Sequence, residues 1–361
     1  MGNRKRKPAF RGKTLDKRIG LVGFGLGGAR FHAPLISAAE GLELAAIVTS
    51  DAGRAGEASA RFPGAKVVAN VDSLADLAVD CVVVATPNRH HVEIASRFLG
   101  LGVPVVVDKP LAIGAEAAAG LVAVAEASSV PLTVFQNRRW DGDFLTVRQL
   151  VDAGRLGEVV RFESRFDKWA PEPTGRARES GDPADGGGLL LDLGSHLIDQ
   201  AIELFGPVET VLAQLEAVVG DADDDDTLLL RHQAGVVSQL GMSVLGSMPV
   251  RRFTVTGSTG SYVKRGLDVQ EGQLARGVIP GDAVWGVEEE TLWGHVWKGS
   301  GKAVPVPTTR GAYEAFYAGV REMLDGAAPP VDPADAVRGL AVIDAARISS
   351  AEGRAVTVSE S

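Results

Sequence analysis

An aspartate and a histidine four positions apart are the residues of this chain best suited to acid–base chemistry. They begin and end the run Asp192-Leu-Gly-Ser-His196. If this run is helical, the two side chains share one face, because residues four apart are neighbours on a helix surface. The face would place a carboxylate beside the side chain whose ordinary pKa suits proton transfer near neutral pH. We expect an acid–base pair here; a helix with one polar face is the alternative, and we expect no metal because no third ligand is evident.

A lysine stands at the carboxyl end of an apolar run that predicts a buried strand. Lys109 follows Val103-Pro-Val-Val-Val-Asp108 and precedes Pro110, which disfavours helical geometry at the lysine. Its ammonium could donate to a substrate hydroxyl and stabilise negative charge that develops on that oxygen. A surface lysine at the start of a loop is the alternative that position alone leaves open.

The run Gly23-Phe-Gly-Leu-Gly-Gly28 has the spacing of a dinucleotide-binding turn. It ends a predicted strand, residues 19–24, and opens a predicted helix, residues 27–39, which is the context that this motif requires. Gly23 would allow the tight turn, Gly25 the close approach of a pyrophosphate, and Gly28 the packing of helix on strand. Oriented N–H groups at the helix N-terminus would bind the phosphates. We expect cofactor contacts along the whole turn: Gly23, Phe24, Gly25, Leu26, Gly27 and Gly28.

The end of the next predicted strand, residues 44–48, bears on the choice of cofactor. NAD-binding proteins usually carry an acid there, which binds the ribose 2′-hydroxyl. In this chain the strand is followed by Thr49-Ser50-Asp51, with Arg54 just beyond. Ser50 and Arg54 could bind a 2′-phosphate through hydroxyl and guanidinium donors. These residues favour NADP, while Asp51 keeps NAD open as the alternative.

The elements that must position these residues alternate between apolar strands and helices. Further strands are predicted at residues 80–85, 103–108 and 132–135, with helices at 89–100 and 115–127. Such alternation indicates a parallel sheet buried on both faces, in which ligands bind beyond the carboxyl ends of the strands. We therefore predict a dinucleotide-binding Rossmann domain, a doubly wound parallel sheet, over residues 19–137.

The pattern changes after residue 137. Residues 158–167 alternate like a half-exposed strand, and further strands of an antiparallel sheet are predicted at 209–220, 227–231, 235–245 and 251–257. Late helices are predicted at 313–324 and 333–349. We predict a second, α/β domain over residues 138–361. The acidic run at 221–226 lacks the glycine and the final glutamate of a calcium loop, so we interpret it as a solvated turn.

Composition excludes several classes of protein. The net charge is −9, and residues 1–18 hold eight Lys/Arg against one Asp, so the rest of the chain is strongly acidic. An acidic body argues against nucleic acid as the main partner, and residues 1–18 are expected to be a basic disordered tail. No window is long and apolar enough to span a membrane. The single cysteine, Cys81, cannot form a disulfide within the chain and lies in an apolar run typical of a buried strand, which makes a cytoplasmic location the expectation.

The motifs together resemble the Gfo/Idh/MocA family of oxidoreductases. The resemblance rests on Gly23–Gly28, Ala85-Thr-Pro-Asn-Arg-His-His91, Asp108-Lys-Pro110 and Asp192-Leu-Gly-Ser-His196. Phe135-Gln-Asn-Arg-Arg-Trp-Asp141 and Gly266-Leu-Asp-Val-Gln-Glu271 are similar to the branch with NADP-dependent scyllo-inositol dehydrogenases and sugar reductases. The lysine motif of the family usually begins with Glu, and here Asp108, a shorter acid, takes that place.

This resemblance implies a Rossmann domain followed by an α/β domain with an open, mainly antiparallel sheet that binds substrate and forms homodimers or homotetramers. It also implies that Lys109, Asp192 and His196 meet over the nicotinamide as catalytic and substrate-binding residues. His196 would take the hydroxyl proton, Asp192 would orient it or the substrate, and Lys109 would polarise the reacting oxygen. The cofactor side would be formed by Thr86, Pro87, Asn88, His91, Asp108, Lys109 and Gln136. Arg165 and Trp169 would contact polyol hydroxyls.

The leading hypothesis is an NAD(P)-dependent dehydrogenase, with NADP preferred, that acts on a CH–OH group of a cyclic polyol or sugar such as an inositol. An NAD-dependent glycosidase of the same architecture is the first alternative. A non-catalytic nucleotide-sensing regulatory protein is the second, although a sensor would not need Lys109 and His196.

Overall fold

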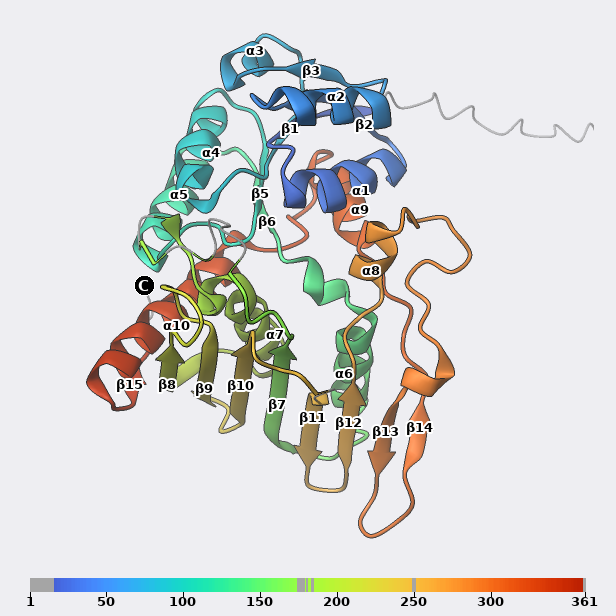
Figure 1. The fold of residues 1–361 in the computed structure, drawn as a ribbon, viewed down its shortest axis with the longest axis vertical. Helices are drawn as coiled ribbons and strands as arrows, with labels where there is room; N and C mark the ends of the chain where they lie inside the picture. The colour runs from blue at the N-terminus through green and yellow to red at the C-terminus, as the bar shows by residue number, and fades with distance from the viewer. Residues whose placement is uncertain (1–15, 174–178, 180, 183–184, 249–250, 360–361) are drawn as a thin grey trace, which may run out of the picture.

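A six-stranded parallel sheet forms the upper part of the molecule in Figure 1, and a second, larger sheet lies below it. The computed structural model describes residues 16–173, 179, 181–182, 185–248 and 251–359. The strands of the first sheet follow the order β3-β2-β1-β4-β5-β6, which is the order of a doubly wound dinucleotide-binding fold. They are β1 (Lys17–Val22), β2 (Leu42–Val48), β3 (Lys66–Val68), β4 (Cys81–Val84), β5 (Val105–Asp108) and β6 (Leu132–Phe135). The predicted parallel sheet is confirmed.

Helices cover both faces of this sheet. On one face Val82 packs in the same cluster as Phe98 of α4, and on the other Val83 packs with Leu35 of α1 and Phe316 of α9. The helical segments are η1 (Gly28–His32), α1 (Ala33–Ala38), α2 (Ala52–Arg61), α3 (Val71–Ala75), η2 (Asn88–His90), α4 (His91–Gly100), α5 (Ala115–Ser128) and, late in the chain, α9 (Glu314–Met323). Burial raises the pKa of Cys81 in β4 to about 12, so this thiol stays protonated in the core.

The second sheet has nine strands within the described residues, in the order β14-β13-β12-β11-β7-β10-β9-β8-β15. β7 and β10 run parallel, and the other neighbours are antiparallel, which confirms the predicted open, mainly antiparallel sheet. The strands are β7 (Val159–Asp167), β8 (Val208–Glu216), β9 (Asp225–His232), β10 (Val237–Ser243), β11 (Arg251–Gly257), β12 (Ser261–Arg265), β13 (Gly294–Trp297), β14 (Val304–Val306) and β15 (Val356–Thr357).

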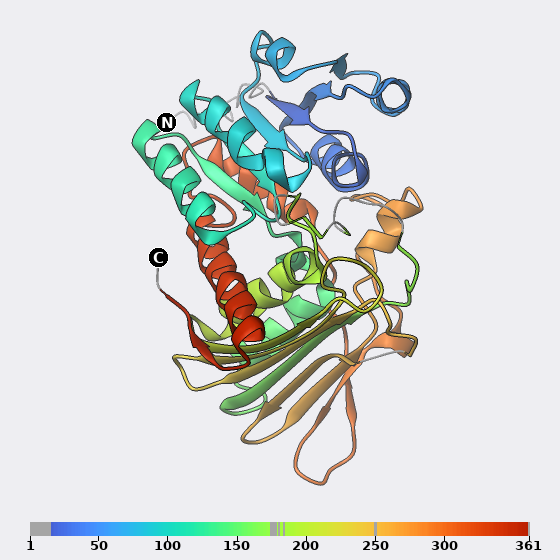
Figure 2. The same cartoon turned by 60° about the vertical axis from the view of Figure 1, so that its left-hand side comes forward.

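Helices lie on one face of the second sheet, and Figure 2 shows no described helix on its other face. The helical segments from residue 137 on, apart from α9, are η3 (Asn137–Trp140), α6 (Gly142–Asp152), η6 (Leu190–Gly194), α7 (Ser195–Phe205), α8 (Gln270–Ala275), η7 (Glu290–Leu292) and α10 (Pro333–Glu352). Of these, α8 packs on the core of the first sheet through Leu274. The sequence predicts α9, α10 and the helix of Asp192 and His196, but not α6, α8 or β12–β15. The domain boundary after residue 137 stays a prediction; α9 packs on the core of the first sheet rather than on the second.

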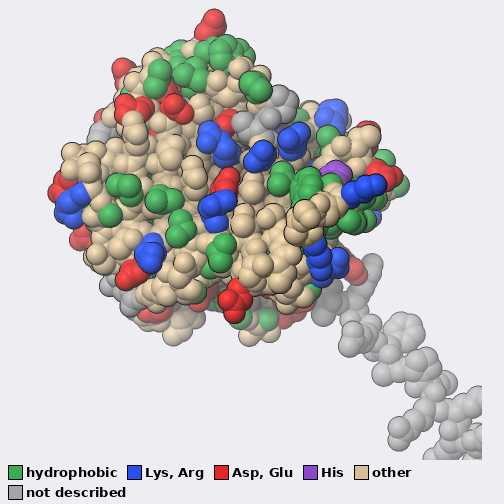
Figure 3. All heavy atoms as spheres, turned by 90° about the horizontal axis from the view of Figure 1, so that it is seen from below, with side chains coloured by type: hydrophobic (Ala, Val, Ile, Leu, Met, Phe, Trp, Pro, Cys, Tyr) green, Lys and Arg blue, Asp and Glu red, His purple; other side chains and the backbone are tan. Residues whose placement is uncertain are grey.

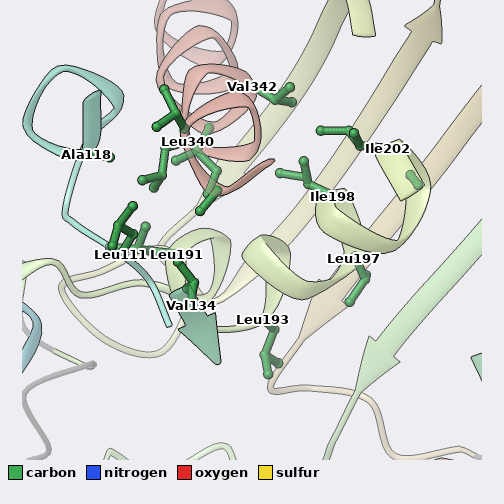
Figure 4. Close-up of a cluster of buried hydrophobic side chains, with 14 of the residues drawn as sticks. Leu111, Ala118, Val134, Leu191, Leu193, Leu197, Ile198, Ile202, Leu340 and Val342 are labelled. Carbon is green, nitrogen blue, oxygen red and sulfur yellow. The ribbon is translucent and has the colours of Figure 1, made fainter. Parts of the chain in front are cut away.

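A shared core joins the end of β5 to the helix that carries His196. Figure 4 shows Leu111 and Leu191 beside Leu340 of α10, with Ile198 and Ile202 of α7 turned to the same helix. Each such side chain contributes about 1.5–3 kcal/mol on burial. The core therefore fixes the position of α7 relative to the carboxyl edge of the first sheet.

The two charged segments of the sequence differ from their predictions. The basic tail was expected to reach residue 18, but β1 begins at Lys17; residues 1–15 lie outside the described residues. The acidic run is not a solvated turn, because Asp224 and Asp226 are buried. The Asp224 carboxylate accepts three backbone N–H bonds, from Val218, Val219 and Gly220, each 2.8 Å long. These three hydrogen bonds replace the water that an exposed carboxylate would bind, so Asp224 is a structural residue of the loop.

The uncovered face of the second sheet carries mixed side chains. Leu212 of β8 and Leu229 of β9 lie opposite each other and are both 43% exposed. Arg161 and Glu163 of β7 form an exposed ion pair. In Figure 3 hydrophobic side chains are interspersed with basic and acidic ones. The predicted burial of this face between subunits stays a prediction.

Candidate active site

Lys109 and Asp192 meet at the carboxyl end of β5. The Lys109 ammonium donates to the Asp192 carboxylate Oδ1 and to the Asp192 backbone oxygen, both at 2.7 Å. The two side chains are 17% and 20% exposed, so the pair is largely enclosed yet reachable from outside. The peptide bond from Lys109 to Pro110 is cis. The interpretation of Lys109 as a surface lysine at a loop start does not agree with this contact.

The π-helical turn η6 leads directly into α7, so that Asp192 and His196 lie on one continuous helical segment. The start of the turn is fixed by a hydrogen bond, in which the Asp223 carboxylate accepts from the N–H of Leu190 at 2.7 Å. Gly188, at φ +94°, has its Cβ position only 2.0 Å from Asp223 Oδ1, so any other residue there would displace the carboxylate. The β8–β9 loop thus fixes the start of the helix that carries the candidate acid–base pair.

His196 is almost fully buried, and its Nδ1 has no hydrogen-bond partner among the described residues. Burial lowers the pKa of His196 well below its ordinary value, and the positive charges of Lys109, Arg138 and Arg252 lower it further. At neutral pH the ring is therefore uncharged and able to accept a proton.

The glycine turn has the geometry that a bound pyrophosphate requires. Gly23 has φ +102°, and its Cβ position lies 2.3 Å from the backbone oxygen of Ala85. The Cβ position of Gly28 lies 2.1 Å from the backbone oxygen of Gly23, whereas that of Gly25 has nothing within 4 Å. Two glycines are thus required by close packing, and the third borders open space where a phosphate could approach the backbone.

The other residues of the turn differ in how they could serve a cofactor. The Phe24 side chain is buried in the core against Phe62, so only its backbone could contact a ligand. Leu26 is about half exposed. The Cβ position of Gly27 lies 2.6 Å from Asp108 Oδ2, so this glycine accommodates the acid that precedes Lys109.

Two buried polar atoms on the predicted cofactor side have no hydrogen-bond partner among the described residues. They are Thr86 Oγ1, after β4, and Gln136 Oε1, after β6. An unpaired buried polar atom costs about 1–3 kcal/mol, so such atoms mark a place where a ligand would supply the missing partner. Together with the open space at Gly25, they make this edge of the sheet fit a nicotinamide dinucleotide.

His91, Asn88 and Pro87 shape the same edge through the backbone. The His91 ring lies 2.8 Å from the backbone oxygen of Pro110 and 2.9 Å from that of Thr86, and it is 1% exposed. Asn88 donates to the backbone oxygen of Gly186 at 2.9 Å, and Pro87 precedes the 3₁₀ turn η2. His91 therefore ties the loop after Lys109 to the end of β4, and its ring has no nitrogen directed at a cofactor.

At the end of β2, Asp51 is the N-terminal cap of α2. Its Oδ1 accepts from the N–H of Arg54 at 2.8 Å. Ser50 and Arg54 are both exposed. The carboxylate that would favour NAD is thus engaged at the helix terminus, while the two candidate phosphate ligands are accessible.

Two buried arginines near His196 were not singled out from the sequence. Arg138 and Arg252 lie over the Phe166 ring at 4.8 and 5.8 Å, and Gln200 of α7 donates to the backbone oxygen of Arg138. Arg138 lies just past the carboxyl end of β6, where ligands bind in parallel sheets, and this position in the sequence could have identified it as a site residue. Its Nε has no hydrogen-bond partner among the described residues, so it too could meet a ligand.

Arg165 and Trp169 are not brought to the other site residues. On β7 the buried face holds Phe162, Ser164 and Phe166, so Arg165 belongs to the opposite face, the one away from α7. There it pairs with Asp167 at 3.0 Å. Trp169 is 62% exposed beyond the strand. A direct contact of either side chain with a substrate held by His196 is not supported within this chain.

The described residues offer neither a metal site nor a membrane-spanning helix. They contain no cluster of three or more His, Cys, Asp or Glu side chains arranged to hold a metal ion. None of their helices combines the length and the apolarity needed to cross a membrane.

Comparison with known proteins gives matches along nearly the whole chain. Residues 17–136 match the oxidoreductase family with an NAD-binding Rossmann fold, and residues 144–263 match the GFO/IDH/MocA C-terminal domain. The uncharacterized oxidoreductase YdgJ of Escherichia coli is 39% identical over 94% of this chain and 97% of its own length. The NADP(+) scyllo-inositol 2-dehydrogenase IolW of Bacillus subtilis is 33% identical over 94% of this chain and 95% of its own.

Solved structures agree with these matches. A putative oxidoreductase from Klebsiella pneumoniae superposes with a TM-score of 0.87 at 36% identity, over 96% of both chains. The putative oxidoreductase yvaA from Bacillus subtilis superposes with a TM-score of 0.90 at 32% identity, over 96% of this chain and 100% of the other. With both domains matched and the fold shared end to end, the chain belongs to the Gfo/Idh/MocA family of oxidoreductases, enzymes built on an NAD(P)-binding Rossmann fold.

Proposed function

We propose that this oxidoreductase prefers NADP and transfers a hydride between the cofactor and a CH–OH group of a cyclic polyol or sugar, such as an inositol. The observation that carries the proposal is the Lys109–Asp192 pair beside a buried, uncharged His196 at the carboxyl end of β5. The activities for which IolW and an inositol 2-dehydrogenase from Rhizobium meliloti are named, the latter 33% identical over 220 residues, support the substrate class.

The nicotinamide cofactor, when bound, supplies the hydride acceptor for alcohol oxidation. The glycine turn would hold its pyrophosphate, and Thr86 and Gln136 would pair their free polar atoms with it. Ser50 and Arg54 would bind the 2′-phosphate. Asp108, Asn88, His91 and Pro87 would contribute through the shape of the loops around it.

Residues of the chain itself accept the hydroxyl proton and stabilise the negative charge on the reacting oxygen. His196 accepts the hydroxyl proton of the substrate, because its lowered pKa keeps the ring uncharged at neutral pH. Lys109 donates a hydrogen bond to the reacting oxygen and stabilises its negative charge. Asp192 holds the Lys109 ammonium through the 2.7 Å contact, so its first role is to position the lysine.

A panel of inositols, other polyols and aldoses tests the proposal, with NADPH or NADH formation followed by fluorescence. Oxidation of a cyclic polyol with NADP, lost in His196→Ala, is the expected result. Release of a sugar from a glycoside would favour the glycosidase instead. Nucleotide binding without turnover of any compound would favour the sensor.

A further inference from the structure

A buried chain of polar groups runs behind the active site from α9 to the catalytic lysine. His32, the last residue of η1, lies with Nδ1 2.6 Å from the Tyr317 hydroxyl of α9. Its Nε2 lies 3.5 Å from Asp108 Oδ2. Asp108 Oδ1 accepts from the N–H of Lys109 at 2.9 Å, and Lys109 in turn contacts Asp192. Neither Tyr317 nor His32 has a place in the chemistry derived above.

The direction of the hydrogen bonds follows from burial. Tyr317 and His32 are both fully buried, and burial raises the pKa of the Tyr317 phenol well above its ordinary value. The phenol therefore keeps its proton and can donate it to His32 Nδ1. A neutral imidazole that accepts at Nδ1 carries its proton on Nε2. That N–H then faces the Asp108 carboxylate, whose Oδ2 lies 3.5 Å away, an electrostatic contact rather than a hydrogen bond.

Asp108 is held as a carboxylate by the same group. Burial by itself would raise its pKa, but the neighbouring His32 ring and the Lys109 ammonium hold the pKa below its ordinary value. Its two oxygens have separate tasks: Oδ1 binds the Lys109 backbone, and Oδ2 lies between His32 and the Cβ position of Gly27. Rotation of this carboxylate would disturb the lysine and the phosphate-binding turn together.

We propose that His32 and Tyr317 are positioning residues that orient Asp108 and, through it, both Lys109 and the glycine turn. The proposal rests on the proposed function for the role of Lys109, but its effect on the glycine turn does not. A hydrophobic pair could fill the same space, whereas buried polar groups are costly unless each finds its partner. In this site the contacts of Tyr317 and His32 lead to Asp108, whose orientation they can set.

The test compares Tyr317→Phe with a matched control, Tyr262→Phe. Tyr262 is equally buried, lies in β12, and its hydroxyl has no hydrogen-bond partner among the described residues. For Tyr317→Phe we expect the dissociation constant of NADPH to rise at least threefold and kcat to fall about tenfold, with KM for the polyol within twofold. Tyr262→Phe should change none of these values by more than twofold.

The second arm is a cycle with Asp108→Asn, which removes the charge that His32 orients. If Tyr317 acts through Asp108, Tyr317→Phe will change NADPH binding and kcat less than twofold in the Asp108→Asn background. Equal losses in both backgrounds would overturn the proposal, as would equal behaviour of Tyr317→Phe and Tyr262→Phe.

A direct measurement covers the case in which a variant fails to fold. Nitrogen-15 spectra of histidine-labelled wild-type protein report which ring nitrogen of His32 carries hydrogen, with His32→Gln for assignment. A proton on Nε2 supports the proposal; a proton on Nδ1 alone overturns it, because a lone pair would then face the carboxylate. Absence of turnover on every polyol, with the NADPH cycle as expected, would refute the proposed function and leave the positioning role standing.

Discussion

Replacement of Asp226 by asparagine should stabilise this protein, and the gain should grow with pH. Asp226 lies in β9 at 1% exposure, and neither carboxylate oxygen has a hydrogen-bond donor among the described residues. Burial, together with the facing Asp223 and the neighbouring Asp225, raises its pKa to about 9. The folded protein therefore holds a proton on this group at neutral pH, whereas the unfolded chain does not.

The size of the effect follows from proton linkage. Each pH unit between the unfolded and folded pKa values is worth about 1.36 kcal/mol, so Asp226 costs about 4 kcal/mol at pH 7. Because the folded pKa is raised, the stability is complete below about pH 4, falls as pH rises, and levels off above about pH 9. Asparagine is neutral in both states and can donate to Asp223. With some loss from altered geometry, we expect a net gain of about 1–3 kcal/mol at pH 7.

The assay is urea unfolding of wild type and Asp226→Asn at one-unit steps from pH 5 to 9. The difference in free energy of unfolding should increase with pH over this range. Asp224→Asn is the matched control two residues away: it cannot accept three backbone N–H bonds on two oxygens, so it should destabilise the fold at every pH. A difference between wild type and Asp226→Asn that stays constant with pH would show that Asp226 is ionised in the folded protein, and the reasoning would be refuted.

Four further predictions concern the site and the assembly. Arg54→Ala should weaken NADPH binding by about 1–3 kcal/mol and leave NADH binding unchanged, measured by fluorescence titration; equal losses would exclude Arg54 as a 2′-phosphate ligand. His196→Ala should lower kcat by about 10²–10⁴-fold. It should also remove the rise of the oxidation rate with pH, which in wild type should lie below pH 6.5 because the His196 pKa is lowered. If the rate of the variant still rises with pH in the same way, another group is the general base. Lys109→Ala should lower kcat while the NADPH dissociation constant stays within a few-fold; a large loss of binding would make Lys109 a cofactor anchor. Leu229→Lys, opposite Leu212, should convert an oligomer to monomers by light scattering; a wild-type monomer at micromolar concentration would contradict the predicted interface.

The first sheet was predictable because each of its central strands is a continuous apolar run bounded by glycine or polar residues. β4 and β5, for example, consist almost wholly of valine, which indicates strands buried on both faces. The late strands of the second sheet lack this signal. β14 contains a proline and is an edge strand of three residues, so neither its length nor its pattern separates it from a loop.

Within the site, local spacing predicted which residues lie on one element, and long-range packing decided the rest. The four-residue spacing of Asp192 and His196 indicated a shared helix, but nothing in that run indicated that Lys109, 83 positions earlier, would bind Asp192. The expectation for Arg165 came from resemblance alone. The alternation of side chains along β7 already predicts that Arg165 lies on the face of the sheet away from Phe166. The structure agrees with this alternation.

The charges around His196 also bear on the direction of the proposed reaction. Lys109, Arg138 and Arg252 all lower the pKa of this histidine, and burial lowers it most. A neutral imidazole is ready to accept the proton of an alcohol, but reduction of a ketone needs a proton donor at the same place. By microscopic reversibility that donor is the protonated form of His196, and the lowered pKa keeps this form rare at neutral pH. Both directions would therefore use His196, and its burial and cationic surroundings leave the ring at neutral pH in the unprotonated state from which oxidation starts.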